Sequence, residues 1–259
     1  MTTQSETGGL VVAAIDGGSW SSAFGRSLLA MTLVDAHGER RLLREGCGPL
    51  FKDAPSGGIA DARNACVQRF LDVPQPEWLL MLDTDMVFDS DLPERMIASA
   101  TEAGVPVLSA LCFALKTIGR GPLGVPRSAI IPTIYDWVSI PGPKGVERGF
   151  LPRSSYERDS VVECDGVGAA ALLVHREALR TVIGRLGKHE TGPFDRITVP
   201  GINGEGGPRI FSEDLSFCIR AGGAGVRLAV DTSIKTAHDK GGIWLDEDAF
   251  DATAAKGQS

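Results

Sequence analysis

Two aspartates that follow an apolar run are the residues of this chain most suited to chemistry. Residues 78–82 (Trp-Leu-Leu-Met-Leu) lead directly into Asp83, Thr84 and Asp85. Side chains two residues apart in an extended segment point to the same side, so both carboxylates can converge on one divalent cation at the end of a strand. Oxygen ligands favour Mg²⁺ or Mn²⁺ over Zn²⁺, and such an ion keeps open positions for substrate phosphates. We therefore expect a metal site for a nucleotide diphosphate; the alternative is a surface turn, where aspartate is common.

The beginning of the chain has the order of elements with which an α/β nucleotide site opens. Residues 10–15 form an apolar run that predicts a buried strand, and residues 16–19 (Asp-Gly-Gly-Ser) predict a turn. A helix is expected over residues 21–34, capped by Ser19 or Ser21.

Strands and helices then alternate, which predicts one large α/β domain with a mostly parallel central sheet. The expected elements are strands at residues 41–45, 78–82, 105–112, 161–164, 169–174 and 226–230, and helices at residues 59–71, 92–103, 176–186 and 212–221. Residues 51–58 are expected to form a loop, and the glycine-rich residues 201–207 a mobile segment. The small, polar tail from residue 252 is expected to fray.

The segment from residue 116 to residue 160 lacks a clear period and is rich in proline and glycine, with strand candidates only at residues 130–134 and 137–140. A loop of that length usually has a function. Residues 116–158 of this segment have a charge of +4, in a chain whose net charge is −7. The seven basic residues are Lys116, Arg120, Arg127, Lys144, Arg148, Arg153 and Arg158. They could meet an anionic partner, or they could lie in a solvated loop and pair with nearby acids.

Composition places the chain among ordinary globular proteins, with 259 residues, 43% hydrophobic and 23% charged. The five cysteines form no Cys-x-x-Cys pair, so neither a disulfide framework nor a zinc cage is indicated. No apolar run approaches the roughly 18 to 20 residues that span a bilayer, and residues 1–9 do not resemble a signal peptide. We expect a cytoplasmic protein.

Several motifs in a fixed order are more specific than any one of them. They are Ala62-Arg63-Asn64, residues 80–85 with the Asp-x-Asp, Val167-Gly168 before an apolar strand, residues 212–218 (Ser-Glu-Asp-Leu-Ser-Phe-Cys), and a late His238. Together they resemble the GT-A-fold, nucleotide-sugar-dependent glycosyltransferases, over residues 10–244. The compact, anchor-free chain resembles the small bacterial and phage members, which implies the cytoplasm of a bacterial cell or of a phage-infected host.

The resemblance implies a Rossmann-like, three-layer α/β/α catalytic domain over residues 1–251. Its donor-binding half would be at about residues 10–112 and its acceptor half at about 113–251, with a frayed tail at residues 252–259. Asp83, Asp85 and His238 would hold Mn²⁺ or Mg²⁺, which acts as Lewis acid and template.

An acidic residue at the start of the helix that follows Ser212 would serve the acceptor. Asp214 is the candidate base of an inverting displacement, and Glu213 could equally be the functional member. First-turn acids also stabilise a helix without any catalysis, and in a retaining enzyme Asp214 would bind sugar hydroxyls instead.

The donor would be a nucleotide-diphosphate sugar, with a UDP-sugar as first choice. Its candidate contacts are Asp16, Gly17, Asp61, Arg63, Asn64, Asp83, Lys240 and Trp244. Lys240 and the following glycine pair would form a flap that closes on the diphosphate, with Trp244 excluding water. The alternatives are a tight turn, an arginine on a helix surface and a tryptophan that packs the end of the domain.

Two other readings of the Asp-x-Asp compete. In a haloacid-dehalogenase-like phosphatase Asp83 would be a phosphoryl nucleophile, but that motif usually continues with Gly-Thr near the amino terminus, whereas Met86 and Val87 follow here at mid-chain. A non-catalytic sugar-nucleotide-binding domain would need a broken metal set. For the acceptor, a carbohydrate or small hydroxyl compound is favoured, and the basic segment keeps hydroxymethylated DNA as a second hypothesis, for which a base would be flipped out of the duplex.

Overall fold

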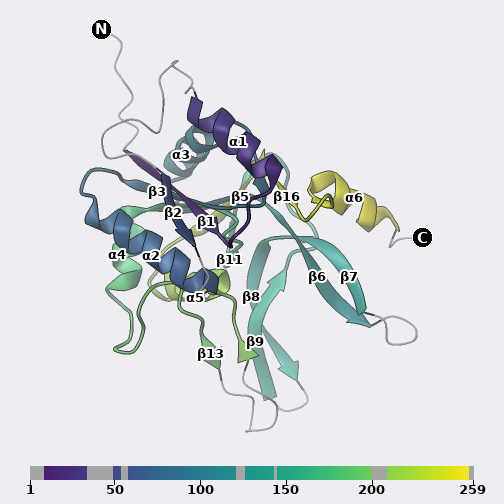
Figure 1. Ribbon diagram of the computed structural model, residues 1–259. Helices are drawn as coiled ribbons and strands as arrows, with labels where there is room; N and C mark the ends of the chain where they lie inside the picture. The colour runs from purple at the N-terminus through teal and green to yellow at the C-terminus, as the bar shows by residue number, and fades with distance from the viewer. Residues whose placement is uncertain are drawn as a thin grey trace.

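The computed structural model describes residues 9–33, 49–53, 58–120, 126–142, 145–199 and 209–256. Its centre is a seven-stranded sheet with the strand order β10-β15-β5-β12-β3-β1-β2 (Figure 1). The strands are β1 (Leu10–Asp16), β2 (Pro49–Asp53), β3 (Trp78–Asp83), β5 (Val107–Leu111), β10 (Val161–Cys164), β12 (Ala171–His175) and β15 (Leu228–Lys235).

The sheet is mixed, so the expectation of a mostly parallel sheet was wrong. The β1–β2, β1–β3 and β5–β15 pairs are parallel, whereas β12 runs antiparallel to both β3 and β5, and β10 antiparallel to β15. The physical reason is that β12 is buried on both faces. An apolar run of this kind is equally compatible with a parallel and an antiparallel strand, and the alternation of strands with helices does not determine the direction of β12.

Alternate residues of the strands pack against helices on opposite faces, which makes three layers. On one face lie α2 (Gly58–Asp72), α4 (Arg176–Ile183) and α5 (Glu213–Gly223), packed over Val11 and Ala13. On the other lie α1 (Ser22–Leu33) and α3 (Leu92–Ala103), packed over Val12 and Ala14. The period of two along β1 thus serves both cores.

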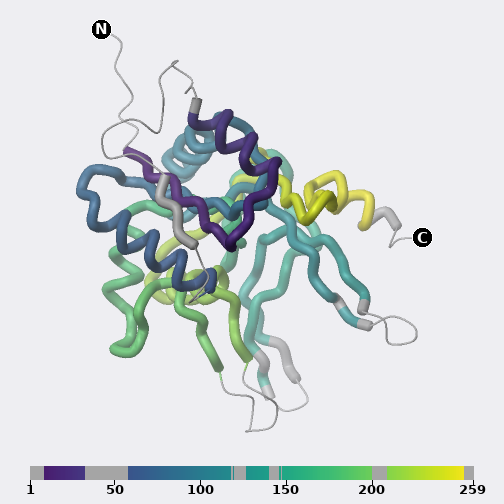
Figure 2. The backbone as a smooth tube through the Cα atoms, in the orientation of Figure 1, coloured from purple at the N-terminus to yellow at the C-terminus, as the bar shows by residue number. Residues whose placement is uncertain are grey.

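The segment expected to be a long loop folds instead into hairpins. The strands β6 (Phe113–Arg120) and β7 (Pro126–Pro132) pair, as do β8 (Ile134–Gly142) and β9 (Gly145–Pro152), and both hairpins project from the body (Figure 2). The sequence does not mark these strands clearly, because they contain prolines and glycines. The outer part of a projecting arm also needs no alternation of apolar and polar residues, since residues such as 115–117 are exposed in succession. The remaining strands are short: β4 (Met86–Val87), β11 (Gly166–Val167), β13 (Thr198–Val199), β14 (Arg209–Ile210), β16 (Ala237–Asp239) and β17 (Trp244–Leu245). β17, β16 and β4 form a three-stranded sheet, β11 joins β8 and β9, and β13 pairs with β14.

A further expectation was wrong at the end of an element, because strand β2 takes up Pro49–Asp53, part of which was expected to be a loop. The expected strand at residues 41–45 lies outside the described residues, as do residues 201–207. In the segment expected to fray, residues 252–256 belong to helix α6 (Glu247–Lys256), whose first residue forms ion pairs, and residues 257–259 lie outside the described residues. Within the described residues, no helix is long and apolar enough to cross a membrane.

Candidate metal and nucleotide site

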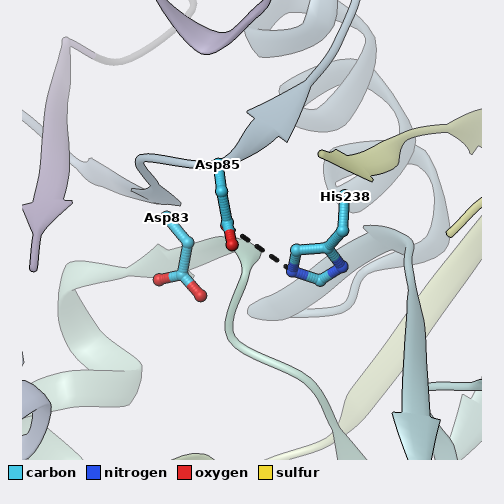
Figure 3. A group of neighbouring side chains, drawn as sticks. All are labelled: Asp83, Asp85 and His238. Atoms are coloured by element: carbon cyan, nitrogen blue, oxygen red, sulfur yellow. Dashed lines mark ion pairs between the residues drawn. The ribbon is translucent and has the colours of Figure 1, made fainter. Parts of the chain in front are cut away.

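Asp83, Asp85 and His238 come together at one edge of the sheet. Asp83 is the last residue of β3, and Asp85 lies in the tight turn that leads into β4. One ligand atom from each of the three side chains lies within 4.8 Å of the others, and both carboxylates and the imidazole face a common space (Figure 3). The two carboxylates thus lie as the i, i+2 spacing predicts, and the distant histidine joins them.

Strand pairing carries His238 to the aspartates. β16 runs antiparallel to β4, with His238 opposite Met86, and the amide of Asp239 donates to the carbonyl oxygen of Asp85 at 2.8 Å. The histidine is therefore fixed by the backbone of the same turn that presents Asp85. This small sheet closes a gap of about 150 residues in the sequence.

The hydrogen bond of Nδ1 sets the tautomer of His238. Nδ1 lies 2.7 Å from the carbonyl oxygen of Phe113, and a carbonyl can only accept, so Nδ1 carries the proton. Nε2 then presents a lone pair, 3.9 Å from Oδ1 of Asp85, which is too long for a hydrogen bond. Two carboxylates and an oriented imidazole nitrogen are a donor set that fits a divalent cation.

Arg63 lies beneath the aspartates and is only 1% exposed. One Nη donates to Asp83 Oδ1 at 2.7 Å and the other to the carbonyl of Ala169 at 3.0 Å, while Nε lies 3.6 Å from Glu213 and has no hydrogen-bond partner in the described part of the chain. Burial alone would lower the pKa of Arg63, but Asp83, Glu213 and Asp214 outweigh it and raise that pKa. The guanidinium therefore stays charged and connects the metal cluster with the start of α5.

Glu213 and Asp214 occupy the first turn of α5 but differ in exposure. Glu213 is buried and lies between Arg63 and Arg196, with the latter 3.7 Å away. Asp214 is half-buried and accepts only from the amide of Leu215, at 2.8 Å, among its described hydrogen bonds. Burial, followed by the charge of Asp214, raises the pKa of Tyr135, which lies near the start of β8.

A cleft of about 550 Å³ opens beside the aspartates. Its walls come from four places in the sequence: the end of β1 with the turn that follows it, the start of α2, the Asp-x-Asp turn and the β16–β17 turn. The lining residues include Ile15, Gly17, Ser19, Trp20, Ile59, Asp83, Asp85, Lys240 and Gly241. Asp16 holds its turn by accepting from the amide of Gly18 at 2.8 Å, and Gly18 needs its φ of 98°. The volume is within the usual range for a small-ligand site.

The β16–β17 turn places a lysine against the metal cluster. Lys240 Nζ forms an ion pair with Oδ2 of Asp85, and its amide donates to the carbonyl of Ile243 at 2.9 Å. Gly241 and Gly242 have φ values of 70° and 93°, so the tight turn depends on glycine. Trp244 follows, 43% exposed, on β17.

Three predicted donor contacts on α2, namely Asp61, Arg63 and Asn64, are not among the residues that line this cleft. Both ends of the Asn64 amide bind the loop before residue 196: Nδ2 donates to Asp195 at 2.7 Å, and Oδ1 accepts from the amide of Phe194 at 2.9 Å. Asp61 is exposed on the first turn of α2. Arg63, with its hydrogen bonds inside the protein, likewise supports the site from below rather than facing the cleft.

Sequence reasoning missed three features of the site. The carbonyl of Phe113 is a backbone group, so no side-chain motif announces it. Trp20, in the segment before α1, and Ile59, in the first turn of α2, also line the cleft, although an apolar residue at such a position is usually expected to pack in the core. Lys240 was expected to contact a diphosphate, but its ion pair with Asp85 requires the register of the β16–β17 hairpin, which the sequence does not reveal.

Comparison with solved structures relates the chain to A197 from STIV. The sequence identity is 15%, the TM-score is 0.50, and the match covers 93% of this chain and 91% of that chain. The chain is also similar to GalNAc-T7, solved with UDP, GalNAc and Mn²⁺, at 12% identity and a TM-score of 0.48, over 88% of this chain and 42% of that one. No protein-family model and no curated protein matches the sequence. The likeness to A197 shows a shared fold.

Proposed function

We propose that this chain is a metal-dependent glycosyltransferase of the GT-A type, which moves a sugar from a nucleotide-diphosphate donor to a hydroxyl acceptor. The observation that carries the proposal is the cluster of Asp83, Asp85 and the tautomer-fixed His238 at the mouth of a 550 Å³ cleft. The order of motifs in the sequence supports the same class. Other Asp-x-Asp chemistries do not need an imidazole brought in by a distant strand.

Oxygen atoms of Asp83 and Asp85 and Nε2 of His238 would hold the ion. Mn²⁺ suits this set better than Mg²⁺, because an imidazole joins the carboxylates. When bound, the ion supplies positive charge to the diphosphate leaving group as the bond between the sugar and oxygen breaks. Arg63 orients the carboxylate of Asp83 by its 2.7 Å hydrogen bond, which is a positioning role.

The donor nucleotide would lie in the cleft, with a UDP-sugar as the preferred donor. The turn at Asp16 and Gly17 borders the cleft and offers backbone groups to a ribose or base, while Trp20 offers an aromatic ring. Lys240 lies on the glycine turn that borders the same cleft. On donor binding its ammonium would leave its ion pair with Asp85 and pair with a donor phosphate instead.

Asp214 would accept the proton from the acceptor hydroxyl as that oxygen attacks the anomeric carbon, in an inverting displacement. Its carboxylate is half-buried, whereas Glu213 is buried and already neutralised by Arg63 and Arg196. This difference in partners favours Asp214 as the base and Glu213 as a support for Arg63.

The acceptor would be a carbohydrate or a small hydroxyl compound. A second candidate is DNA with hydroxymethylated bases, because Lys116, Arg127 and Arg148 are exposed on the projecting hairpins. Nothing in the proposal requires a membrane.

Melting temperature in the presence of ligands tests the proposed function directly. The protein is melted with EDTA, Mg²⁺ or Mn²⁺, alone and with a panel of UDP-, GDP-, CDP- and dTDP-sugars. We expect a UDP-sugar to raise the Tm by roughly 5 °C or more, and only with a divalent ion present, since a ligand that binds the folded state stabilises it by mass action. No shift with any nucleotide sugar, or metal-dependent hydrolysis of a phosphate monoester instead, would contradict the proposal.

A further inference from the structure

A second cavity, of about 530 Å³, lies at the opposite end of α5 from Asp214. It is enclosed by the β8–β9 hairpin, the end of β10, the second half of α5 and the segment leading into β15, and Figure 1 shows α5 beside β8. The lining residues are Trp137, Phe150, Glu163, Cys164, Asp165, Cys218, Ile219, Gly222, Gly223, Val226, Arg227 and Leu228. Because α5 rises about 1.5 Å per residue, Gly222 lies roughly 12 Å from Asp214 along the helix. The cavity shares no lining residue with the metal cleft.

Two glycines in the last turn of α5 keep this cavity open. A Cβ added to Gly222 or Gly223 would meet no atom within 4 Å, and neither residue has the positive φ that requires glycine. Glycine inside a helix costs about 0.5–1 kcal/mol relative to alanine. Neither packing nor backbone geometry therefore explains the pair. Because these two residues have no side chains, the side of the cavity next to Cys218 and Val226 stays open.

The floor of the cavity is apolar and uncharged. Cys218, Val226 and Leu228 are buried there. Burial raises the pKa of the Cys164 thiol to about 12 and also raises that of Cys218, so both thiols are protonated at neutral pH. A floor of this kind suits the carbon face of a ligand rather than a charged group.

The rim combines an exposed indole with carboxylates. Trp137 is 39% exposed and is held in place by Phe150, at a centroid distance of 4.9 Å, and by its own amide, which donates to Oδ2 of Asp165 at 2.8 Å. Within the described residues, Oδ1 of Asp165 has no hydrogen-bond partner. Glu163 pairs with Arg227, so the one cation of the lining is neutralised and the rim has a net charge of −1.

These features select a ligand class. The net negative rim disfavours phosphates and other anions, and the free carboxylate oxygen accepts hydrogen bonds from hydroxyl groups. The indole and the apolar floor take a ring face that carries only carbon and hydrogen. A neutral sugar ring has both properties, with hydroxyls around its edge and an apolar face.

We propose that the cavity between α5 and the β8–β9 hairpin is a second carbohydrate-binding site, in which a neutral sugar stacks on Trp137 and donates hydroxyls to Asp165. The site would hold a remote unit of the acceptor, or a separate glycan, while transfer takes place at the other end of α5. It deepens the proposed function by naming a neutral saccharide as partner, but its own binding does not require the metal cluster.

Saturation-transfer NMR with neutral trisaccharides of glucose, galactose, mannose and N-acetylglucosamine tests the site in the full chain without nucleotide or metal. At least one trisaccharide should bind, and Gly222→Leu should weaken binding at least tenfold by filling the open wall. Gly222→Leu also replaces a helical glycine and should not lower the Tm. Gly25→Leu is the matched control, because Gly25 is a helical glycine with open space on α1, away from this cavity.

Two further variants separate the proposals. Trp137→Ala should lose the saccharide, whereas Asp85→Asn should keep it, because the metal cluster is not part of this cavity. Absence of binding by all four trisaccharides, or binding that Gly222→Leu leaves unchanged, would overturn the second site while leaving the glycosyltransferase proposal intact. Displacement of an apolar dye from the cavity with no saccharide binding would show an apolar ligand and would also overturn it.

Discussion

The role of His238 depends on a backbone carbonyl 125 positions away in the chain. An imidazole can present either nitrogen as a ligand, and the hydrogen bond of Nδ1 with Phe113 decides which. The same ring without that contact would be a weak ligand with two tautomers. The nearby aromatic rings of Tyr156 and Phe250 hold Phe113, at centroid distances of 6.5 and 5.5 Å. A small aromatic cluster of Phe113, Tyr156 and Phe250 therefore supports the backbone contact that orients His238.

Asp85→Asn and His238→Ala should each abolish metal-dependent donor binding with little change in fold. Each removes a ligand atom or its charge, and neither residue belongs to the two apolar core clusters. Calorimetric titration with Mn²⁺ and a UDP-sugar, together with circular dichroism, measures both effects. Asp89→Asn is the control, because its exposed carboxylate lies on the same connection but outside the cluster. Unchanged Mn²⁺ affinity in either variant would exclude this cluster as the metal site.

Asp214→Asn should leave donor binding intact and lower turnover by at least about a hundredfold, which is the usual minimum for the loss of a general base. The same substitution also removes a first-turn acid from α5, so Asp248→Asn in the first turn of α6 serves as control. Single-turnover rates and donor affinity are measured together. A loss of donor affinity with a small effect on rate would assign Asp214 to the sugar hydroxyls instead.

Arg63→Met should lower the free energy of unfolding by about 3–5 kcal/mol, because Asp83 and Glu213 lose their buried counter-ion. Urea denaturation measures this cost. Adding Asp83→Asn to Arg63→Met should recover part of it, since the two residues interact directly, with a coupling of roughly 0.5–3 kcal/mol. If the losses of unfolding free energy in Arg63→Met and Asp83→Asn simply added in the double variant, the two side chains would not interact, and this would contradict the prediction.

Among the elements, α6 is the one that supports the site from outside the three layers. Its first residue, Glu247, is 8% exposed and receives three contacts: the Tyr156 hydroxyl at 2.9 Å, Lys235 at 2.6 Å and Arg158 at 3.4 Å. Through Phe250 and Phe113, this helix packs behind the carbonyl that orients His238. The anchoring of α6 should therefore matter to metal binding as well as to stability.

The pH dependence of stability should report on Glu247. Burial would raise the pKa of this carboxyl, but Lys235 and Tyr156 outweigh it and hold the pKa below the ordinary value of 4.5. A depressed pKa in the folded state adds stability that is complete above the unfolded value and is lost as pH falls through the folded one. Glu247→Gln should thus be less stable than the wild type at neutral pH, and the gap should narrow in acid.

Urea denaturation from about pH 7 to about pH 3 measures that gap. Glu102→Gln, which alters an exposed carboxylate on α3, is the control and should show no narrowing. A constant difference between wild type and Glu247→Gln over the whole range would contradict the assignment of the depressed pKa to these contacts.

Elements that pack in the apolar core were the ones that the sequence predicted well. The helix expected at residues 92–103 has the same bounds as α3, and the strand before Asp83 was predicted to within one residue. The hairpins were predicted only in part: the strand candidate at residues 137–140 lies within β8 and the one at residues 130–134 overlaps β7, whereas β6 and β9 were missed. The reason is that cross-strand hydrogen bonds, rather than an apolar period, hold these strands. The grouping of Asp83, Asp85 and His238 was anticipated from spacing and family resemblance, whereas the Phe113 and Arg63 contacts depend on tertiary packing that no local pattern predicts.

At the scale of the whole molecule, charge is distributed unevenly between the body and the hairpins. Two of the seven basic residues of the segment are neutralised, because Arg153 pairs with Asp136 and Arg158 with Asp251. Lys116, Arg127 and Arg148 remain exposed on the arms, and no ion pair involves them within the described residues. This pairing reduces the surface available to a polyanion and favours the carbohydrate acceptor over DNA.

The salt response of acceptor binding should decide between the two acceptors. If three arm residues contacted nucleic-acid phosphates, affinity would fall roughly tenfold or more between about 50 and 200 mM salt, because each neutralised phosphate releases counter-ions. A neutral saccharide acceptor should show almost no slope, and this is the outcome we expect.

Binding of hydroxymethylated DNA and of a neutral oligosaccharide is measured at both salt concentrations. The triple variant Lys116→Ala, Arg127→Ala, Arg148→Ala is compared with Arg26→Ala, Arg69→Ala, Lys188→Ala, which removes the same charge from exposed sites elsewhere. Tight, salt-sensitive binding to the modified DNA that only the first triple variant loses would reverse the preference, because it would place the phosphates on the arms.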